Sequence, residues 1–283
     1  MSTPSAADVL AQVERSLAEH PRIVLCQIVR VQGSTPGKLG WKMLVRPDGS
    51  AFGNLGGGAF EALALGDART LLAGGETSRT ERYYLTEDAV KGQATGMVCG
   101  GMIEVFLEVV SARPVLAVCG GGPVGQALAR QALLCDFDVV VLEDREEFRR
   151  AELFPAEAQT VEVTRDYDGD FLGPWRAREL FVAVVSRCWE TDLAAATGVL
   201  RADLPGLMYL GVMGSRRKID RVEQGLAKAN LSLDDVEWDA PIGLDLGGST
   251  PAEIAVSIAA KLIRVRHAAT QRKASPTSAV RLV

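Results

Sequence analysis

The stretch VLAVCGGGPVGQALARQALLCDFDVVVLEDREEF, residues 115–148, decides the fold of this chain. A short apolar run leads into three glycines, a helix-like segment follows, and a second apolar run ends in acids. Gly120 permits a tight turn, Gly122 lets the backbone approach a phosphate, and Gly125 lets helix and strand pack closely. The stretch therefore predicts a strand, a glycine-rich cradle, a helix and a second strand, as in nucleotide-binding folds.

An acidic residue follows the cradle at the spacing where dinucleotide-binding folds place their ribose-binding acid. Glu143 comes 23 residues after Gly120, at the end of the second apolar run, where an acid can bind the ribose hydroxyls of a dinucleotide. Its negative charge disfavours a 2′-phosphate, so NAD is preferred to NADP, and Asp144 is the next candidate. The alternative is that the glycines only form a tight turn, because a fold does not settle a function.

The residues after the cradle alternate between apolar runs and helical stretches. Further strands are expected at residues 159–163, 180–186 and 207–212, and this rhythm predicts a parallel sheet with right-handed crossovers. A last helix begins at STPAE, where Thr250 can be the N-cap, Pro251 the first helical residue, and Glu253 the partner in a capping box.

The residues before the cradle form a second, mixed region. The segment SARP at residues 111–114 breaks regular structure and marks the boundary. Before it we expect a leading helix, a strand at RIVLCQIVR, two strands around Pro47-Asp48-Gly49, a helix entered from glycines, and a closing strand. The fold class is therefore α/β, with a small mixed domain at 1–112, a Rossmann-like parallel-sheet domain at 113–270, and a flexible tail at 271–283.

Composition excludes several classes of protein. The chain has 283 residues, 47% hydrophobic residues and a net charge of −5, so it has no basic footprint for nucleic acid. No apolar run approaches the roughly 20 residues that a membrane span needs, and the N-terminal residues lack the pattern of an export signal. Five scattered cysteines and two histidines favour reduced thiols in a cytoplasmic protein and leave little material for a zinc site.

Three further motifs place glycine or charge beside an expected helix. NLGGGAFE is a second possible anion-binding turn, although its acid also suits the dipole of any helix that follows. GVMGSRRK puts cations in the first turn of a helix, where they oppose the dipole unless an anion binds there, and a solvated basic face is the alternative. PIGLDLGGSTP supplies an acid that lines a site or closes its own turn. The candidate residues are Gly56, Gly57, Gly58, Glu61, Gly214, Ser215, Arg216, Arg217 and Asp245.

Taken together, these stretches resemble the xanthine dehydrogenase accessory factor family, XdhC/CoxI. The resemblance spans residues 20 to 267 and includes GSTPGKLGWKMLVRPDGSAFGNLGGGAFE, GMVCGGMIEVFLE, the cradle, YLGVMGSRRK and APIGLDLGGSTPAEIAVSIAAKLI. It implies a cytoplasmic, often dimeric chaperone for xanthine dehydrogenase or aldehyde oxidoreductase maturation. Such a protein binds molybdenum cofactor, as molybdopterin or its dinucleotide, while a cysteine desulfurase supplies sulfur, and then delivers it to the apo molybdenum hydroxylase.

One cysteine fits the chemistry that the resemblance implies. Cys99 stands between glycines in GMVCGG, where backbone N–H groups can favour the thiolate, a soft ligand for molybdenum or a carrier of sulfur. We therefore assign Cys99 as the catalytic and metal-binding thiol, with a small buried residue as the alternative. Cys188 is a weaker candidate at the end of a strand.

Two positions depart from the family pattern. Residues 186–189 read Ser-Arg-Cys-Trp where many members have a histidine, and Ala59 stands where some relatives have a cysteine. Roles carried by those side chains are therefore not assigned to this chain.

A different class of function stays open. A complete cradle with Glu143 also suits an NAD-dependent oxidoreductase or a non-catalytic NAD sensor. No histidine is well placed as its general acid or base, which leaves Tyr83, Tyr84 and Tyr209. The sequence favours a cofactor-binding chaperone with little covalent chemistry of its own, and the enzyme alternative remains.

Overall fold

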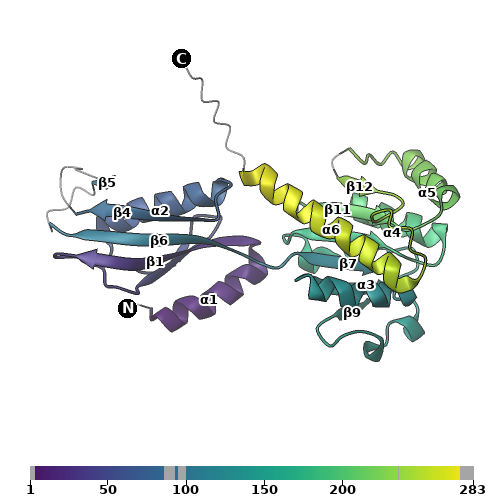
Figure 1. The fold of residues 1–283 in the computed structure, drawn as a ribbon, viewed down its shortest axis with the longest axis horizontal. Coiled ribbons are helices and arrows are strands. Elements are labelled where there is room, and N and C mark those ends of the chain that lie inside the picture. The colour runs from purple at the N-terminus through teal and green to yellow at the C-terminus, as the bar shows by residue number, and fades with distance from the viewer. Residues whose placement is uncertain (1–3, 86–92, 95–99, 235, 275–283) are drawn as a thin grey trace, which may run out of the picture. The chain divides into compact units, whose positions relative to one another are not determined.

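The computed structural model describes residues 4–85, 93–94, 100–234 and 236–274. The chain divides into two compact units, one comprising the residues up to Ala112 together with those from Ala269 onward, the other Arg113–Ala268 (Figure 1). Each unit contains one six-stranded sheet, so the fold class predicted from the sequence is confirmed.

The first unit is a mostly antiparallel sheet with a helix on each face. Its strand order is β3-β2-β1-β6-β4-β5, and only the β4–β5 pair is parallel. Its elements are α1 (Ala6–Glu19), β1 (Arg22–Gln32), β2 (Lys42–Val45), β3 (Ala51–Gly53), α2 (Gly58–Ala73), β4 (Ser78–Tyr84), β5 (Gln93–Ala94) and β6 (Met102–Ser111).

Alternation along β1 explains why helices cover both faces of this sheet. Val24, Cys26 and Ile28 point into a core shared with α2, whereas Ile23 points to the other face, where Val9 of α1 packs. This period of two is the signature of a strand whose two faces are both covered. The leading helix begins with a capping box in which Ser5 and Asp8 exchange hydrogen bonds.

The second unit is a parallel sheet in the order β12-β11-β10-β7-β8-β9. Its elements are β7 (Val115–Cys119), α3 (Pro123–Leu134), β8 (Asp138–Glu143), β9 (Gln159–Glu162), β10 (Leu180–Val184), α4 (Trp189–Arg201), β11 (Leu207–Val212), α5 (Arg216–Lys228), β12 (Glu237–Asp239) and the part of α6 (Pro251–Ala274) up to Ala268, with short 3₁₀ turns at Glu146–Phe148, Ala151–Leu153 and Gly173–Trp175.

Helices cover both faces of this sheet, which explains its continuous apolar strands. All five residues of β7 and all five of β10 are buried. Residues of α4 and α5 share one core with the sheet, and residues of α3 and α6 share the other. The strands predicted from the sequence are observed, although β9 ends at Glu162, one residue earlier than expected, and β10 at Val184, two residues earlier. The capping box of α6 is confirmed, because Glu253 accepts hydrogen bonds from the backbone and hydroxyl of Thr250.

Candidate functional site at the carboxyl edge of the parallel sheet

The order of the parallel strands marks the place where a ligand is expected. The chain starts at the central strand β7, moves outward through β8 and β9, and then returns to β10 on the other side of β7. The order therefore reverses between β7 and β10, and ligands of open parallel sheets bind at the carboxyl end of such a switch point. The glycine-rich turn follows β7 at this point.

Each glycine of the turn has a separate structural reason. A Cβ on Gly125 would lie 2.0 Å from the carbonyl oxygen of Gly120, so α3 can approach β7 only without a side chain there. Gly121 is blocked in the same way by the carbonyl of Phe148 at 2.3 Å. A Cβ on Gly122 would meet no atom within 4 Å, so its missing side chain leaves open space. Packing thus requires Gly121 and Gly125, whereas Gly122 leaves the backbone accessible.

The helix that leaves the turn presents its N-terminus without a carboxylate of its own. Gly122 is the N-cap of α3, Pro123 fills the first position, and the first turn contains no acid. The side chain of Gln126 donates to the carbonyl of Gly121 at 3.0 Å and so fixes the turn. The partial positive charge of α3 therefore meets no acid from its own first turn and favours an anion beside Gly122.

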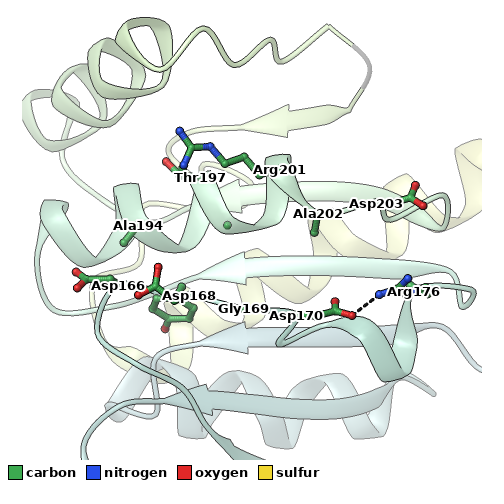
Figure 2. Close-up of a pocket in the computed structure, with 12 residues that line it drawn as sticks. Asp166, Asp168, Gly169, Asp170, Arg176, Ala194, Thr197, Arg201, Ala202 and Asp203 are labelled. Atoms are coloured by element: carbon green, nitrogen blue, oxygen red, sulfur yellow. Dashed lines mark hydrogen bonds and ion pairs between the residues drawn. The ribbon is translucent and has the colours of Figure 1, made fainter.

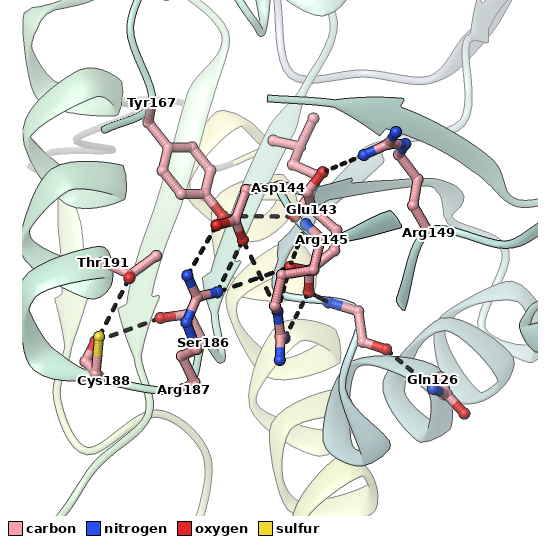
Figure 3. Close-up of polar contacts among 12 residues, drawn as sticks. Gln126, Glu143, Asp144, Arg145, Arg149, Tyr167, Ser186, Arg187, Cys188 and Thr191 are labelled. Atoms are coloured by element: carbon pink, nitrogen blue, oxygen red, sulfur yellow. Dashed lines mark hydrogen bonds and ion pairs between the residues drawn. The ribbon is translucent and has the colours of Figure 1, made fainter. Parts of the chain in front are cut away.

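Glu143 lies at the end of β8 as predicted, but its carboxylate already has partners within the chain. It is 2% exposed, accepts the N–H of Gly121 at 2.7 Å, and pairs with the guanidinium of Arg145 at 2.9 and 3.0 Å (Figure 3). Arg145 also stacks over the ring of Phe148, 4.0 Å from its centre. Ribose hydroxyls would have to compete with these contacts for the carboxylate.

Asp144 and Arg187 form a second pair beside the first. Two nitrogens of Arg187 each donate to one oxygen of Asp144 at 2.8 Å, and the guanidinium also lies 3.9 Å from Glu143 (Figure 3). Hydrogen bonds from Arg187 hold the pKa of Asp144 well below its ordinary value of 3.8, and the carboxylate raises the pKa of Arg187. Both groups are therefore charged at neutral pH.

A buried polar group ties the ends of β10 and β11 together. Asp192, in the first turn of α4, is fully buried, accepts a 2.5 Å hydrogen bond from the hydroxyl of Ser186, and forms an ion pair with Lys218. The ammonium of Lys218 also lies 3.1 Å from the carbonyl of Met213 and 3.4 Å from that of Ser186. Desolvation raises the pKa of Asp192, while Lys218 and Ser186 oppose that shift. Lys218 is thereby fixed in place by its own chain.

The GSRRK motif starts α5 as predicted, but its residues differ in environment. Ser215 occupies the N-cap position, and its side chain makes no capping hydrogen bond. Arg216 and Arg217 are exposed in the first turn, whereas Lys218 turns into the buried group. The sequence singled out the two arginines, and the third cation is the one that the fold uses.

Two predicted residues, Gly214 and Asp245, line one pocket in this unit. The pocket has a volume of about 550 Å³ and is walled by Met213 and Gly214 after β11 and by the loop at residues 241–248. Asp245 accepts the N–H of Gly247 at 3.3 Å, so it closes its own turn as well as lining the pocket. The size lies within the range of small-molecule sites.

The remaining glycine motif belongs to the first unit. Gly57 is the N-cap of α2, and Glu61 in the first turn accepts the N–H groups of Leu55 at 2.8 Å and Gly57 at 3.2 Å. The side chain of Asn54 accepts the N–H of Gly56. The chain's own oxygens thus take the N–H groups of Gly56 and Gly57, which were candidates for an anion, as well as that of Leu55. A contact of Gly58 or Glu61 with a cofactor stays a prediction.

The thiols differ in accessibility. Cys99 lies outside the described residues, so its assignment stays a prediction. Cys26 and Cys119 are fully buried, and burial raises the pKa of Cys26 to about 12 and that of Cys119 further. Cys188 is the N-cap of α4, half-buried, with its sulfur 3.2 Å from the hydroxyl of Thr191 (Figure 3). In the described part of the chain no group of three His, Cys, Asp or Glu side chains could hold a metal ion.

Another pocket of the second unit lies beside α4, away from every predicted residue. It has a volume of about 410 Å³ and is lined by four aspartates and two arginines, of which Arg176 pairs with Asp170 (Figure 2).

Among the described residues, no helix combines the length and the apolar character that a membrane span requires.

Sequence reasoning missed Arg187, Asp192 and Lys218 as parts of this edge. Arg187 and Lys218 belong to stretches quoted above, but their partners lie 43 and 26 residues away in the chain, so only the pairing of strands brings them together. Asp192 had a local signal, because it stands four residues after Cys188 in the first turn of a helix.

Comparison with known proteins shows that two models of one protein family match this chain. The family model described as the XdhC Rossmann domain matches residues 116–262, and the model of the XdhC and CoxI family matches residues 16–84. The uncharacterized protein YqeB of Escherichia coli (strain K12) is 31% identical over 246 residues, which are 86% of this chain and 43% of that protein. A probable xanthine dehydrogenase subunit of Bacillus subtilis (strain 168) is 26% identical over 163 residues, 57% of this chain and 46% of that protein.

Among solved structures, a xanthine dehydrogenase from Bacillus halodurans aligns over 96% of this chain and 98% of that chain, with 21% identity and a TM-score of 0.46. The present chain spans less than half the length of the curated relatives that it matches.

Proposed function

This chain belongs to the XdhC and CoxI family, and from that premise we propose that it is a maturation factor for a molybdenum hydroxylase of the xanthine dehydrogenase or aldehyde oxidoreductase type. In this proposal it binds molybdenum cofactor, supports its sulfuration and delivers it to the apo-enzyme. The observation that carries the proposal is the match of both family models, together with a relative named as a probable xanthine dehydrogenase subunit. The apo-hydroxylase, a cysteine desulfurase and a second copy of this chain are its proposed partners.

The phosphate of such a cofactor fits the turn after β7. Gly122 has open space where a Cβ would be, and α3 begins there with no acid in its first turn. These features favour an anion through backbone N–H groups and the helix dipole. The bound cofactor would supply the sulfido chemistry, while the residues of this chain hold it and exclude water.

The pterin suits a pocket of the same unit. The pocket at residues 213–214 and 241–248 is lined by apolar side chains and backbone, with Asp245 and Ser257 as polar groups. A flat heterocycle with polar edges is suited to such a mixture. Gly214 and Asp245 would line its site, and Arg216 and Arg217, which follow Gly214 by two and three residues, are proposed to add positive charge to it.

The metal end of the cofactor needs a soft ligand. We retain Cys99 for this role because its place beside glycines in the sequence is typical of an accessible, reactive thiol. Of the other thiols, Cys26 and Cys119 are excluded from such a role by complete burial. Cys188 is partly exposed at the carboxyl edge of the sheet and is the second candidate.

The alternative is an NAD-dependent oxidoreductase or NAD sensor, which the strand order and the glycine turn favour. Two observations weigh against it. The carboxylate of Glu143 is engaged by Gly121 and Arg145. Two of the three candidate acids are buried: Tyr83 donates to Asp67 and Tyr209 to Asp239, and burial raises both pKa values.

One experiment tests the proposal against this alternative. The protein is purified from cells that make molybdenum cofactor, denatured, and assayed for oxidised pterin fluorescence and for nicotinamide. Pterin without nicotinamide is expected, and nicotinamide alone would favour the alternative. A Cys99→Ala variant is expected to retain pterin but to lose delivery of active, sulfurated cofactor; full delivery by this variant would remove the role of Cys99.

A further inference from the structure

One ion pair in the second unit joins the two strands that flank the cradle. Asp144 follows β8 and Arg187 follows β10, and both strands are direct, parallel neighbours of β7. The pair therefore connects the carboxyl ends of β8 and β10 on either side of the glycine-rich turn after β7. Hydrogen bonds bring all three ends together, because Gly120 donates to Leu142 and Val185 donates to Cys119, each at 2.9 Å.

The guanidinium of Arg187 is suited to a phosphate as much as to a carboxylate. It binds Asp144 through two parallel hydrogen bonds of 2.8 Å, the fork geometry that arginine uses for either anion. The other cations nearby are also paired, Arg145 with Glu143, Arg149 with Glu162 and Lys218 with Asp192, and their side chains are 26%, 20% and 19% exposed. The Arg187 side chain keeps a third of its surface exposed, whereas Asp144 keeps 15%.

We infer that Arg187 is the phosphate-binding arginine of this cradle, and that Asp144 is its internal competitor, which occupies the guanidinium until a phosphate takes its place. The ligand class is a phosphate ester or diphosphate that lies beside Gly122 at the N-terminus of α3. The inference rests on the proposed function only for the identity of that ligand, since molybdopterin and a dinucleotide both carry such a group. Asp144 thereby sets the affinity of the cradle.

The inference makes opposite predictions for the two partners. With inorganic pyrophosphate as the probe at low salt, Asp144→Asn is expected to bind several-fold more tightly, because the guanidinium no longer has to leave a carboxylate. Arg187→Gln is expected to bind about tenfold more weakly, the worth of a charge-assisted hydrogen-bonded pair, and Arg187→Lys to fall between. In the double variant the gain from Asp144→Asn should disappear.

The chain offers a matched control at the opposite edge of the same sheet. Asp138 begins β8 and pairs at 2.7 Å with Arg178, which precedes β10, so this pair also flanks β7 but at its amino end. Asp138→Asn changes the net charge as much as Asp144→Asn does. It is expected to leave pyrophosphate affinity unchanged, which separates a local effect from a general loss of negative charge.

Isothermal titration calorimetry on the full chain measures these affinities, with circular dichroism to confirm folding of each variant. Equal gains for Asp144→Asn and Asp138→Asn would overturn the inference. So would an unchanged affinity in folded Arg187→Gln and Arg187→Lys, or no pyrophosphate binding to either the wild type or Asp144→Asn.

Two further measurements identify the molecule that carries the phosphate. Titration with NAD⁺ and the pterin content of protein from cofactor-producing cells are compared between the wild type and Arg187→Gln. Loss of pterin in the variant supports both the inference and the proposed function. Suppose instead that Asp144→Asn raises the affinity for pyrophosphate and Arg187→Gln lowers it, but that neither the wild type nor any variant contains pterin. This result would support the inference and contradict the proposed function.

Discussion

The two glycine turns of this protein have similar sequences, but different carboxylates occupy their backbone N–H groups. Gly56 and Gly57 precede α2, whose first residue is Gly58, and Gly120-Gly121-Gly122 precedes α3; each helix has a glycine N-cap. At α2 the carboxylate of Glu61, from the helix itself, takes the N–H groups of Leu55 and Gly57 and has no cationic partner among the described residues. At α3 the nearby carboxylate of Glu143 comes from a neighbouring strand and is paired with Arg145.

The difference shows that glycines before a helix do not by themselves make an anion site. An anion needs donors that the chain has left free and a neighbourhood without uncompensated negative charge. The turn before α2 meets neither requirement around Leu55 and Gly57, whereas the turn before α3 meets both at Gly122.

The largest expected effect is the loss of stability when a side chain is added at Gly125, where α3 packs closely against the turn. Gly125→Ala places a Cβ 2.0 Å from the carbonyl of Gly120, and the backbone must shift. We expect a loss of about 3 kcal/mol in the free energy of unfolding, even though alanine has the better helix propensity by about 1 kcal/mol. Urea denaturation measures it. The control is Gly122→Ala, which should change stability by no more than about 0.5 kcal/mol because its Cβ meets nothing.

A smaller effect tests whether Glu61 serves the turn before α2. Glu61→Ala removes the acceptor of two backbone N–H groups and should cost about 1 to 2 kcal/mol, as the loss of a helix cap does. Glu61→Gln keeps an acceptor oxygen and should cost less. Thermal and urea unfolding of both variants give the measurement, and equal stability of all three proteins would show that the turn does not depend on this carboxylate.

Alanine substitution should also differ in its cost between Gly57 and Gly122, because the two glycines differ in backbone conformation. Gly57 has φ of +77°, a region that side chains disfavour, whereas Gly122 has φ of −66°, and a Cβ on either would meet no atom within 4 Å. Gly57→Ala is therefore expected to cost about 1 kcal/mol more than Gly122→Ala. Parallel urea titrations decide this, and a larger cost for Gly122→Ala would contradict the assignment of conformational and spatial roles.

The smallest effect concerns pH and the pair across the cradle. The lowered pKa of Asp144 means that the pair contributes stability at neutral pH, which is lost as the pH falls below 3.8 through the lower folded-state pKa. The contribution is below about 1 kcal/mol, because water screens partly exposed pairs. Asp144→Asn should therefore lose slightly less stability than the wild type between pH 6 and pH 2. Identical pH profiles would show that the pair adds no net stability.

The alternation of apolar and helical segments predicted the fold because each signal is local. The strand residues of β7, β8 and β11 were identified by their apolar runs, and the capping box at Thr250 and Glu253 by its spacing. Gly120 and Gly125 were correctly given structural roles, since a tight turn and a close helix require absence of a side chain whatever the ligand.

The sequence by itself determined which residues form strands, helices and glycine turns, because hydrophobic period, capping and backbone conformation act over a few neighbouring residues. Only the tertiary structure decided which donors of those turns remain free. Glu61 takes N–H groups only four and six residues before it, whereas the contacts of Glu143 with Gly121 and of Arg187 with Asp144 depend on strands that are distant in sequence and lie together only in the folded sheet.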